Sequence, residues 1–486
     1  MSSAMALHAM PQSVLDLDIL VGGMGVDISS VGLVSTVARH ASGRLSGSLS
    51  ATGLTDVYAR LLQLGDVDGA VRRAFDAFTE KVPALADDVE RLYRRYLVPG
   101  GAALGEQLKG FSLAGPTPPR DVQIFTVLAT FSHVWRTKLA APDRPVGINF
   151  LRKIERVLLY GLYGAMLAGV DWVVMGAGDP GEIPAILDDL ARSRAAELRI
   201  QVATVPRGEH RIRFDPRELV GPDLPPPPRP AFLAIVSSHL QAQALAGNPV
   251  TRPDGFVVEG PVAGGHNAPP RNRVKDDQGN YVYGPEDEAD LDVVAAVGLP
   301  FWVAGGRGRP SDPTASPRGG MRRQVGTLFA LCSESGMEPE LRRSVLRLVW
   351  QRQLDVVASA HASPSGFPFR VARVPGTMGD PATYAARPRV CDLGYLRGWR
   401  PRDGRIVGLC PADDPHLFKT MGGAAWRTEG SVCLCNSLMA TCGLGRRGEP
   451  ALVTLGDTAP VRDLQTRLRR LEYSADEAVA YLRGEL

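Results

Sequence analysis

Cysteine is scarce in this sequence, with six among 486 residues. That number is too small for a disulfide framework and excludes the disulfide-rich class of secreted proteins. An excess of one charge is also lacking, because 55 Lys and Arg residues stand against 52 Asp and Glu, for a net charge of +3. No basic tract interleaved with aromatic residues is present, so the sequence predicts no nucleic-acid partner.

Long apolar runs are missing as well. The most apolar stretch, Val157–Val170, is shorter than the roughly 20 residues that a membrane-spanning helix needs, and Asp171 follows it directly. The first twelve residues combine neither a basic region nor a long apolar region of the kind that directs secretion. We therefore expect no membrane partner and a cytoplasmic location.

Glycine and proline, in contrast, are plentiful, with 53 and 39 residues. Many of the glycines, with Ser and Asn, end short apolar runs, and helical stretches such as Arg152–Ala168 and Ile183–Ala195 separate most of the runs. Apolar runs of this length are typical of parallel strands that are buried on both faces. Eight of them alternating with helices predict an α/β fold, a (β/α)₈ TIM barrel. The predicted strands are Asp18–Val21, Arg44–Ser48, Pro145–Phe150, Trp172–Met175, Ala231–Val236, Gly255–Glu259, Pro300–Ala304 and Gln324–Val325.

Additions to the barrel account for the length of the chain. We predict a barrel over residues 15–337, with a mostly helical insertion at 55–137 and a hairpin insertion at 198–214 around Arg207-Gly208-Glu209. Pro225–Pro228 follows the hairpin as a predicted stiff connector. Residues 338–486 no longer alternate as barrel units do, so we expect a C-terminal α+β extension that covers the mouth of the barrel.

The loop after the sixth predicted strand combines paired glycines with one histidine, Gly264-Gly265-His266. Paired glycines let backbone amides approach a flat or anionic ligand closely. A histidine at the C-terminal end of a barrel strand lies where barrels place their active sites and can act as a general base near neutral pH. His266 is therefore the predicted catalytic residue, against the alternative of a histidine that only satisfies loop carbonyls.

Glycines also follow the seventh and eighth predicted strands, as Gly305-Gly306 and Gly326-Thr327. Barrels often bind a phosphate with the loops after these two strands. Backbone N–H groups and a helix N-terminus favour a dianion there, and the phosphate of a flavin mononucleotide fits this requirement.

Taken in order along the chain, the strand-end segments resemble those of the nitronate monooxygenase family, also called 2-nitropropane dioxygenase-like. The resemblance extends from about Leu20 to Ala330, and Ala263-Gly264-Gly265-His266 is its most specific part. The later segments Cys391–Leu396, Leu434–Ser437 and Leu452–Asp457 resemble a longer bacterial branch of that family.

The resemblance implies non-covalently bound FMN and oxidation of a nitronate-like small metabolite with O₂. It implies that His266 is the base or proton shuttle beside the flavin. The residues that it places around FMN are Gly22, Gly23, Met24, Asn149, Gly176, Glu259, Gly264, Gly265, Ala304, Gly305, Gly306, Gly326 and Thr327. A small-molecule substrate and O₂ are the expected partners, and a homodimer is left open.

The segment Arg307–Arg323 departs from the family pattern. Its prolines and glycines oppose the helix that the family has there. Arg322 and Arg323 stand where a buried strand favours Val or Ile. Two consequences stay open: weakened FMN binding, or arginines that contact the phosphate.

Cysteines concentrate near the C-terminus, at Cys391, Cys410, Cys433 and Cys435. Four thiolates could make a zinc or iron–sulfur site, but the usual Cys-x-x-Cys pair is absent. We therefore predict no metal and keep these four as the alternative site.

Three functions compete at this point. The first is the FMN-dependent oxidoreductase. The second is a flavin-dependent enoyl reductase of fatty-acid or polyketide synthesis, which shares the barrel and the Gly-Gly-His loop but needs NAD(P)H. The third is a flavin-free binding protein, which the departure at Arg307–Arg323 favours. A metal-dependent aldolase barrel lacks a His, Asp or Glu cluster at the predicted strand ends.

Overall fold

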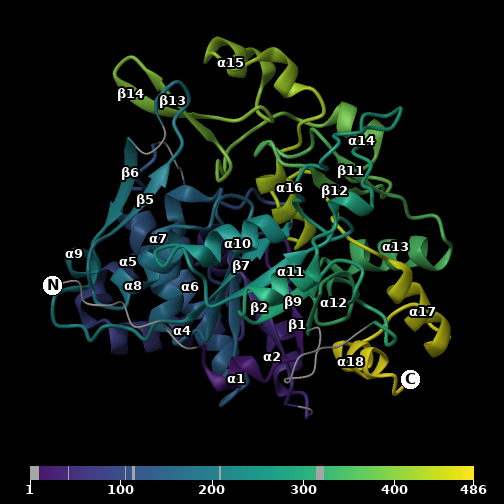
Figure 1. The fold of residues 1–486 in the computed structure, drawn as a ribbon. Helices are drawn as coiled ribbons and strands as arrows, with labels where there is room; N and C mark the ends of the chain where they lie inside the picture. Colours follow the sequence, from purple (N-terminus) through teal and green to yellow (C-terminus); the bar gives the residue numbers. More distant parts are fainter. Residues whose placement is uncertain (1–9, 42, 104, 112–114, 207–208, 313–321) are drawn as a thin grey trace.

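The computed structural model describes residues 10–41, 43–103, 105–111, 115–206, 209–312 and 322–486. Eight parallel strands close into a barrel in the order β1-β10-β9-β8-β7-β4-β3-β2 (Figure 1). The prediction of a (β/α)₈ barrel with eight strands is confirmed. The strands are β1 Ile19–Val21, β2 Leu45–Ser50, β3 Gly147–Leu151, β4 Trp172–Gly176, β7 Ala231–Val236, β8 Gly255–Glu259, β9 Phe301–Ala304 and β10 Arg322–Val325.

Two tryptophans fill the barrel interior together with residues from the segment before β1. Trp172 and Trp302 are fully buried and cluster with Val14 and Leu17. The Trp302 indole N–H donates to the Leu17 carbonyl at 3.0 Å. A Cβ on Gly147 would lie 2.1 Å from the Trp172 ring, so only glycine leaves room for that indole. This packing closes the end of the barrel opposite the strand C-termini.

Helices surround the barrel. They are α2 Val31–Arg39, α7 Glu155–Leu167, α8 Ile183–Leu190, α9 Pro216–Val220, α10 His239–Gly247, α11 Leu291–Ala296 and α12 Thr327–Ala330, with α1 Gln12–Leu15 before β1 and the short η2 Pro285–Asp287 before α11. Helix α8 ends earlier than its predicted range, because the chain turns at Ser193, which has a positive φ of 50°.

The segment between β2 and β3 is helical in the structure. It contains α3 Leu54–Gln63, α4 Ala70–Lys81, η1 Pro83–Leu85, α5 Ala86–Tyr96 and α6 Arg120–Ala140. Helix α6 packs closely against α7, since a Cβ on Gly164 would lie 2.3 Å from the Val127 carbonyl oxygen. Strands β5 Ala196–Ile200 and β6 His210–Phe214 pair as an antiparallel hairpin; Arg207 and Gly208 of the predicted turn lie outside the described residues.

The C-terminal region, residues 338–486, is a mixed α and β segment that lies against the barrel (Figure 1). Its strands form two hairpins, β11 Val356–Ser359 with β12 Phe369–Ala372 and β13 Gly398–Arg402 with β14 Arg405–Leu409. Its helices are α13 Pro339–Trp350, α14 Pro381–Ala386, α15 Pro415–Thr420, η3 Ala425–Thr428, α16 Leu434–Thr441, α17 Ala459–Leu468 and α18 Ala475–Arg483. In the described part of the chain, no helix combines the length and the apolar character that crossing a membrane requires.

The last barrel strand, β10, begins with two arginines, and each makes specific contacts. Arg322 and Arg323 belong to β10, which begins two residues before the predicted strand. The Arg322 guanidinium lies 4.9 Å from the centre of the Trp302 ring. The buried Arg323 side chain donates to the carbonyls of Arg309 and Leu482, at 2.6 and 2.8 Å. Burial of this arginine is compensated by backbone carbonyls, one of them from α18.

Candidate active site

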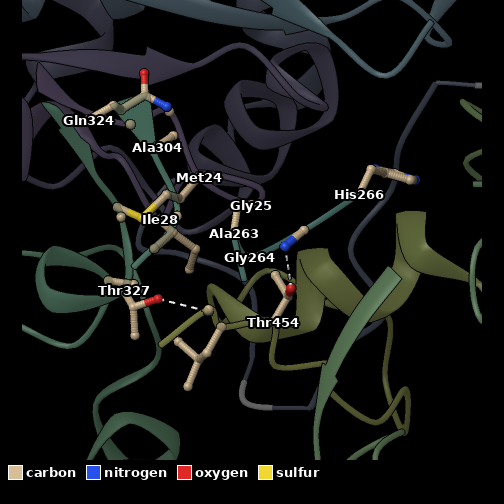
Figure 2. A pocket seen from close by; sticks show the side chains of 18 of the residues that line it. Met24, Gly25, Ile28, Ala263, Gly264, His266, Ala304, Gln324, Thr327 and Thr454 are labelled. Carbon is tan, nitrogen blue, oxygen red and sulfur yellow. Dashed lines mark hydrogen bonds between the residues drawn. The ribbon is translucent and has the colours of Figure 1, made fainter. Parts of the chain in front are cut away.

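One cavity opens at the C-terminal ends of the barrel strands, and Figure 2 shows some of its lining residues, among them Met24, Gly264 and His266. The eight strands run parallel, so loops that are far apart in sequence meet at this end. The predicted residues on its wall are Gly22, Gly23, Met24, Asn149, Gly176, Glu259, Gly264, Gly265, His266, Ala304, Gly305, Gly306, Gly326 and Thr327. The structure therefore brings together His266 and all the residues that the resemblance places around FMN.

The loop after β1 is held in one shape by hydrogen bonds and close packing. The Ser29 hydroxyl donates to the Gly22 carbonyl at 2.7 Å and accepts from the Met24 N–H at 3.0 Å. The Asn149 amide donates to the Gly23 carbonyl at 2.9 Å. A Cβ on Gly23 would lie 2.3 Å from the Asn149 Cβ, so glycine is required for this approach. The loop thus presents its backbone to the cavity in a fixed position.

The C-terminal region is hydrogen-bonded to two of the loops that line the cavity. The Thr327 hydroxyl accepts from the Gly456 N–H at 2.8 Å. The Thr454 hydroxyl accepts from the Gly265 N–H, also at 2.8 Å, as Figure 2 shows. Consecutive positive φ values at Gly305 and Gly306, 87° and 68°, form the turn after β9. The cavity wall is therefore shared between barrel loops and residues near position 455.

Three polar atoms of the cavity wall lack a hydrogen-bond partner within the described residues. They are Nε of Arg307, Oε1 of Gln324 and Oδ1 of Asn149, and all three are buried. An unpaired buried polar group costs roughly 1–3 kcal/mol. These atoms belong to lining residues, but each is almost completely covered by protein, so none of them forms part of the open surface of the cavity.

Glu259 and His266 line the cavity, together with Arg307 and Asp457. Burial raises the pKa of Glu259 to about 8. Burial, with a smaller effect of the Lys153 charge, lowers the pKa of His266 to about 4. Both groups are consequently uncharged at neutral pH, and the imidazole of His266 is free to accept a proton.

His266 lies on the opposite side of the cavity from Gln324 and Thr327 (Figure 2). Its Nε2 is 2.7 Å from the Ser363 hydroxyl, and its ring packs edge-on against Phe369 with centroids 4.9 Å apart. Ser363 and Phe369 both belong to the C-terminal region, so this region fixes the orientation of the predicted base.

Of the arginines that could contact a phosphate, Arg307 lines the cavity. Arg322 and Arg323 make the contacts described above instead, and neither belongs to the cavity wall. Arg322 and Arg323 therefore lie away from the cavity, whereas Arg307 is the arginine of this segment that is placed to meet a ligand there. Residues 307–312 contain no helix, and 313–321, the rest of the divergent segment, lie outside the described residues.

The four cysteines of the alternative metal site pack together, away from the cavity. Cys391, Cys410 and Cys433 form a buried cluster with Cys435 at its edge. Hydrogen bonds from the Cys410 and Cys433 thiols lower the pKa of Cys391 to about 2, and Arg397 Nε lies 3.4 Å from the Cys391 sulfur. The six cysteines are free thiols. Over the described ranges, no three or more His, Cys, Asp or Glu side chains form a group that could hold a metal ion.

Several residues of the site carried no signal that motif analysis could use. Ser363 lies almost a hundred residues after His266 in a segment without a recognisable motif. Gln324 belonged to a predicted strand, whose inward-facing side chains the sequence could not identify. Thr454 and Gly456 stand in the segment Leu452–Asp457, which the resemblance marked but to which it assigned no role.

Comparisons with known proteins give a distant likeness. No protein-family model matches the chain, and no curated protein matches it. Among solved structures, a nitroalkane oxidase from Streptomyces ansochromogenes is similar at 14% identity and a TM-score of 0.45, over 97% of this chain and 95% of that one. The enoyl reductase domain of MlnA from Bacillus amyloliquefaciens, of the macrolactin biosynthesis cluster, gives 11% identity and a TM-score of 0.36, over 76% of this chain and 67% of that one. The case for function rests on the cavity.

Proposed function

We propose that the cavity binds FMN and that the protein is an FMN-dependent oxidoreductase acting on a nitronate-like small metabolite with O₂. The observation that carries this proposal is that His266 and all the residues predicted around FMN converge on one cavity. A barrel with a cavity at its strand C-termini has the features of a ligand site.

The residues present fit this cofactor. The Arg307 guanidinium and the backbone around Gly305–Gly306 and Gly326–Thr327 suit a phosphate dianion, which prefers charged donors and N–H groups. The amide side chains of Asn149 and Gln324 suit the imide group of the flavin ring. These residues would hold FMN through both of its polar ends.

FMN supplies the two-electron chemistry when it is bound. The chain supplies the proton chemistry and the surroundings. With a neutral nitroalkane, His266, itself neutral at physiological pH, would take the proton from the carbon that bears the nitro group and so form the nitronate. Glu259, protonated at neutral pH, adds no negative charge that would repel an anionic substrate or cofactor.

A visible absorbance spectrum of the purified protein, recorded before and after addition of FMN and gel filtration, tests the proposal. We expect flavin bands that stay with the protein and turnover of nitroalkanes or nitronates with O₂. Anaerobic bleaching of the flavin by NADPH, without nitronate turnover, would instead favour the enoyl reductase. Protein that takes up no FMN would overturn the oxidoreductase and favour the flavin-free binding protein.

A further inference from the structure

Two hydroxyl groups continue the hydrogen-bond chain that begins at His266. The Ser363 Oγ lies 2.7 Å from His266 Nε2 and 2.7 Å from the Ser365 Oγ. Ser363 is buried, whereas Ser365 is half-buried and is followed by the exposed Gly366. The chain therefore leads from the imidazole at the cavity wall towards the protein surface.

Counting hydrogens on Ser363 shows that this chain has two states. A hydroxyl has one proton to donate and two acceptor positions. Ser363 Oγ accepts from the Ser365 backbone N–H at 3.2 Å, which leaves one donor and one acceptor position for His266 and Ser365. Either His266 donates to Ser363 and Ser363 to Ser365, or Ser365 donates to Ser363 and Ser363 to His266. Reversal of the chain moves one proton between Nε2 and Ser365.

A base with a lowered pKa needs such a route. Burial and the neighbouring Lys153 hold the pKa of His266 near 4, so a doubly protonated ring is unfavourable at neutral pH. An imidazole that captures a proton at one nitrogen must therefore release the proton of the other. In this structure the neighbour of Nε2 is the Ser363 hydroxyl.

We propose that Ser363 and Ser365 relay protons between His266 and solvent, and that the C-terminal region thereby completes the acid–base machinery of the barrel. This inference rests on the proposed function of His266 as the base. The substrate proton goes to Nδ1, the Nε2 proton passes to the Ser363 oxygen, the Ser363 proton passes to the Ser365 oxygen, and the Ser365 proton leaves to water. Each step breaks one bond to hydrogen and forms one.

Ser363→Ala removes the relay and leaves His266 in place. We expect kcat for a nitroalkane to fall about 10-fold or more, at an unchanged KM and with FMN retained, because the proton leaves the ring slowly. Millimolar imidazole in the buffer should restore part of the rate, since a small base can replace the missing hydroxyl. Ser363→Thr keeps the hydroxyl and should keep the rate.

Ser359→Ala is the matched control. Ser359 precedes the same loop, and its hydroxyl accepts the backbone N–H groups of His361 and Ala362 without contacting His266. We expect this variant to turn over normally and to be insensitive to imidazole. A Ser363→Ala enzyme with unchanged kcat, or with a loss that neither imidazole nor threonine restores, would overturn the relay.

A measurement without turnover separates this inference from the proposed function. In ¹⁵N-histidine-labelled protein, the signals missing from His266→Asn belong to His266 and report its tautomer. Ser363→Ala should change the Nε2 signal, whereas Ser359→Ala should not. Unchanged Nε2 signals in Ser363→Ala would refute the relay even in an active flavoprotein. A flavin-free chain that shows the shift would refute the proposed function while keeping the coupling between Ser363 and His266.

Discussion

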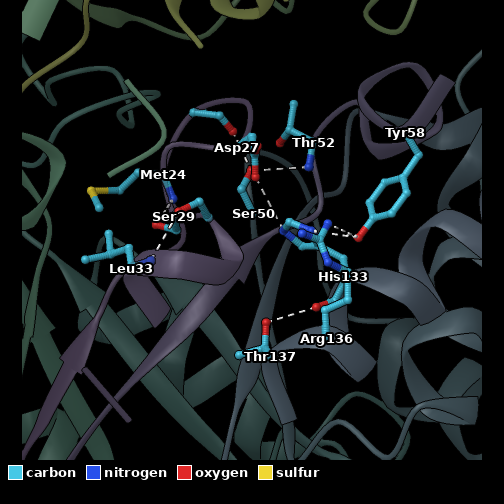
Figure 3. Close-up of polar contacts among 12 residues, drawn as sticks. Met24, Asp27, Ser29, Leu33, Ser50, Thr52, Tyr58, His133, Arg136 and Thr137 are labelled. Carbon is cyan, nitrogen blue, oxygen red and sulfur yellow. Dashed lines mark hydrogen bonds and ion pairs between the residues drawn. The ribbon is translucent and has the colours of Figure 1, made fainter. Parts of the chain in front are cut away.

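His266 is half-buried and His133 is buried, and the two histidines differ in the groups that their ring nitrogens contact. His266 lines the cavity and contacts a chain of hydroxyls. His133 lies on α6, where its Nε2 is 3.7 Å from Asp27 Oδ1, too far for a hydrogen bond, and neither atom has another partner within the described residues (Figure 3). Its Nδ1 is 3.5 Å from the Tyr58 hydroxyl, which accepts from Arg136.

Burial affects the two rings in the same direction. It lowers the pKa of His133 to about 3, with a further contribution from Arg136, and raises the pKa of Asp27 to about 7. The pKa of His266 is about 4 for a similar reason. Burial therefore favours a neutral imidazole in both places. A chain of hydroxyl groups that could carry a proton lies beside His266. Among the contacts described for His133, there is no chain of hydroxyls.

The largest expected effect is on turnover. His266→Asn should leave FMN bound but reduce turnover of a neutral nitroalkane by about 10²-fold or more, because general-base catalysis contributes that much. His133→Asn, the matched change outside the cavity, should leave kcat within about twofold. Steady-state kinetics of the two variants checks this. Equal losses in both would remove the distinction between the two histidines.

The next effect concerns cofactor affinity. Arg307→Ala should weaken FMN binding by about 10- to 100-fold, since charge-assisted hydrogen bonds contribute roughly 1.5–3 kcal/mol. Riboflavin, which has no phosphate, should bind wild type and variant equally. Fluorescence titration with both flavins measures the difference. An equal loss of affinity for FMN and riboflavin would show that Arg307 supports the ring site or the fold.

A smaller effect is expected on stability around His133. The pKa of Asp27 is raised from 3.8 to about 7 in the folded protein. The contribution of its protonated carboxyl to the free energy of unfolding is therefore fully present below pH 4 and is lost as the pH rises through 7. Asp27→Asn removes this loss of stability because the amide does not ionise. Asparagine also tolerates the positive φ of 53° at that position. The gain in unfolding free energy over wild type should therefore be about 1–4 kcal/mol larger at pH 8 than at pH 4.

Urea unfolding at the two pH values checks this expectation. Asp403→Asn is the control, because the Asp403 side chain is 91% exposed in the turn between β13 and β14. A gain that is the same at both pH values would mean that Asp27 is ionised in the folded protein throughout this range.

The smallest effect concerns Glu259, one of two acidic residues that line the cavity. Glu259 has a pKa raised to about 8 by burial, so its carboxyl is neutral below that pH and becomes an anion above it. FMN affinity of the wild type should fall about threefold between pH 7 and 9, since the anion repels the cofactor. Glu259→Gln should show no such fall when its dissociation constant is titrated over the same range. A parallel fall in both proteins would assign the pH dependence elsewhere.

The barrel and its strand ends could be predicted because each depends on local sequence. Runs such as Ala231–Val236 are apolar enough to be buried on both faces, and parallel strands place their ends together. The part of the site that comes from the C-terminal region could not be predicted. The contact between His266 and Ser363 joins residues 97 positions apart, and no periodicity links them. The burial of Arg323 in β10 could not be predicted for a related reason. The carbonyls that accept its hydrogen bonds belong to distant segments of the chain.

The hydrogen bonds that Thr454 and Gly456 make to the loops at Gly265 and Thr327 also imply an order in which parts of the pocket form during synthesis. Domains fold from the N-terminal side as the chain leaves the ribosome, and the eight strands are complete once residue 325 has emerged. The cavity wall, in contrast, lacks two of its loop contacts until residue 456 has been added. A nascent chain thus contains all eight barrel strands well before it contains every residue of the pocket wall.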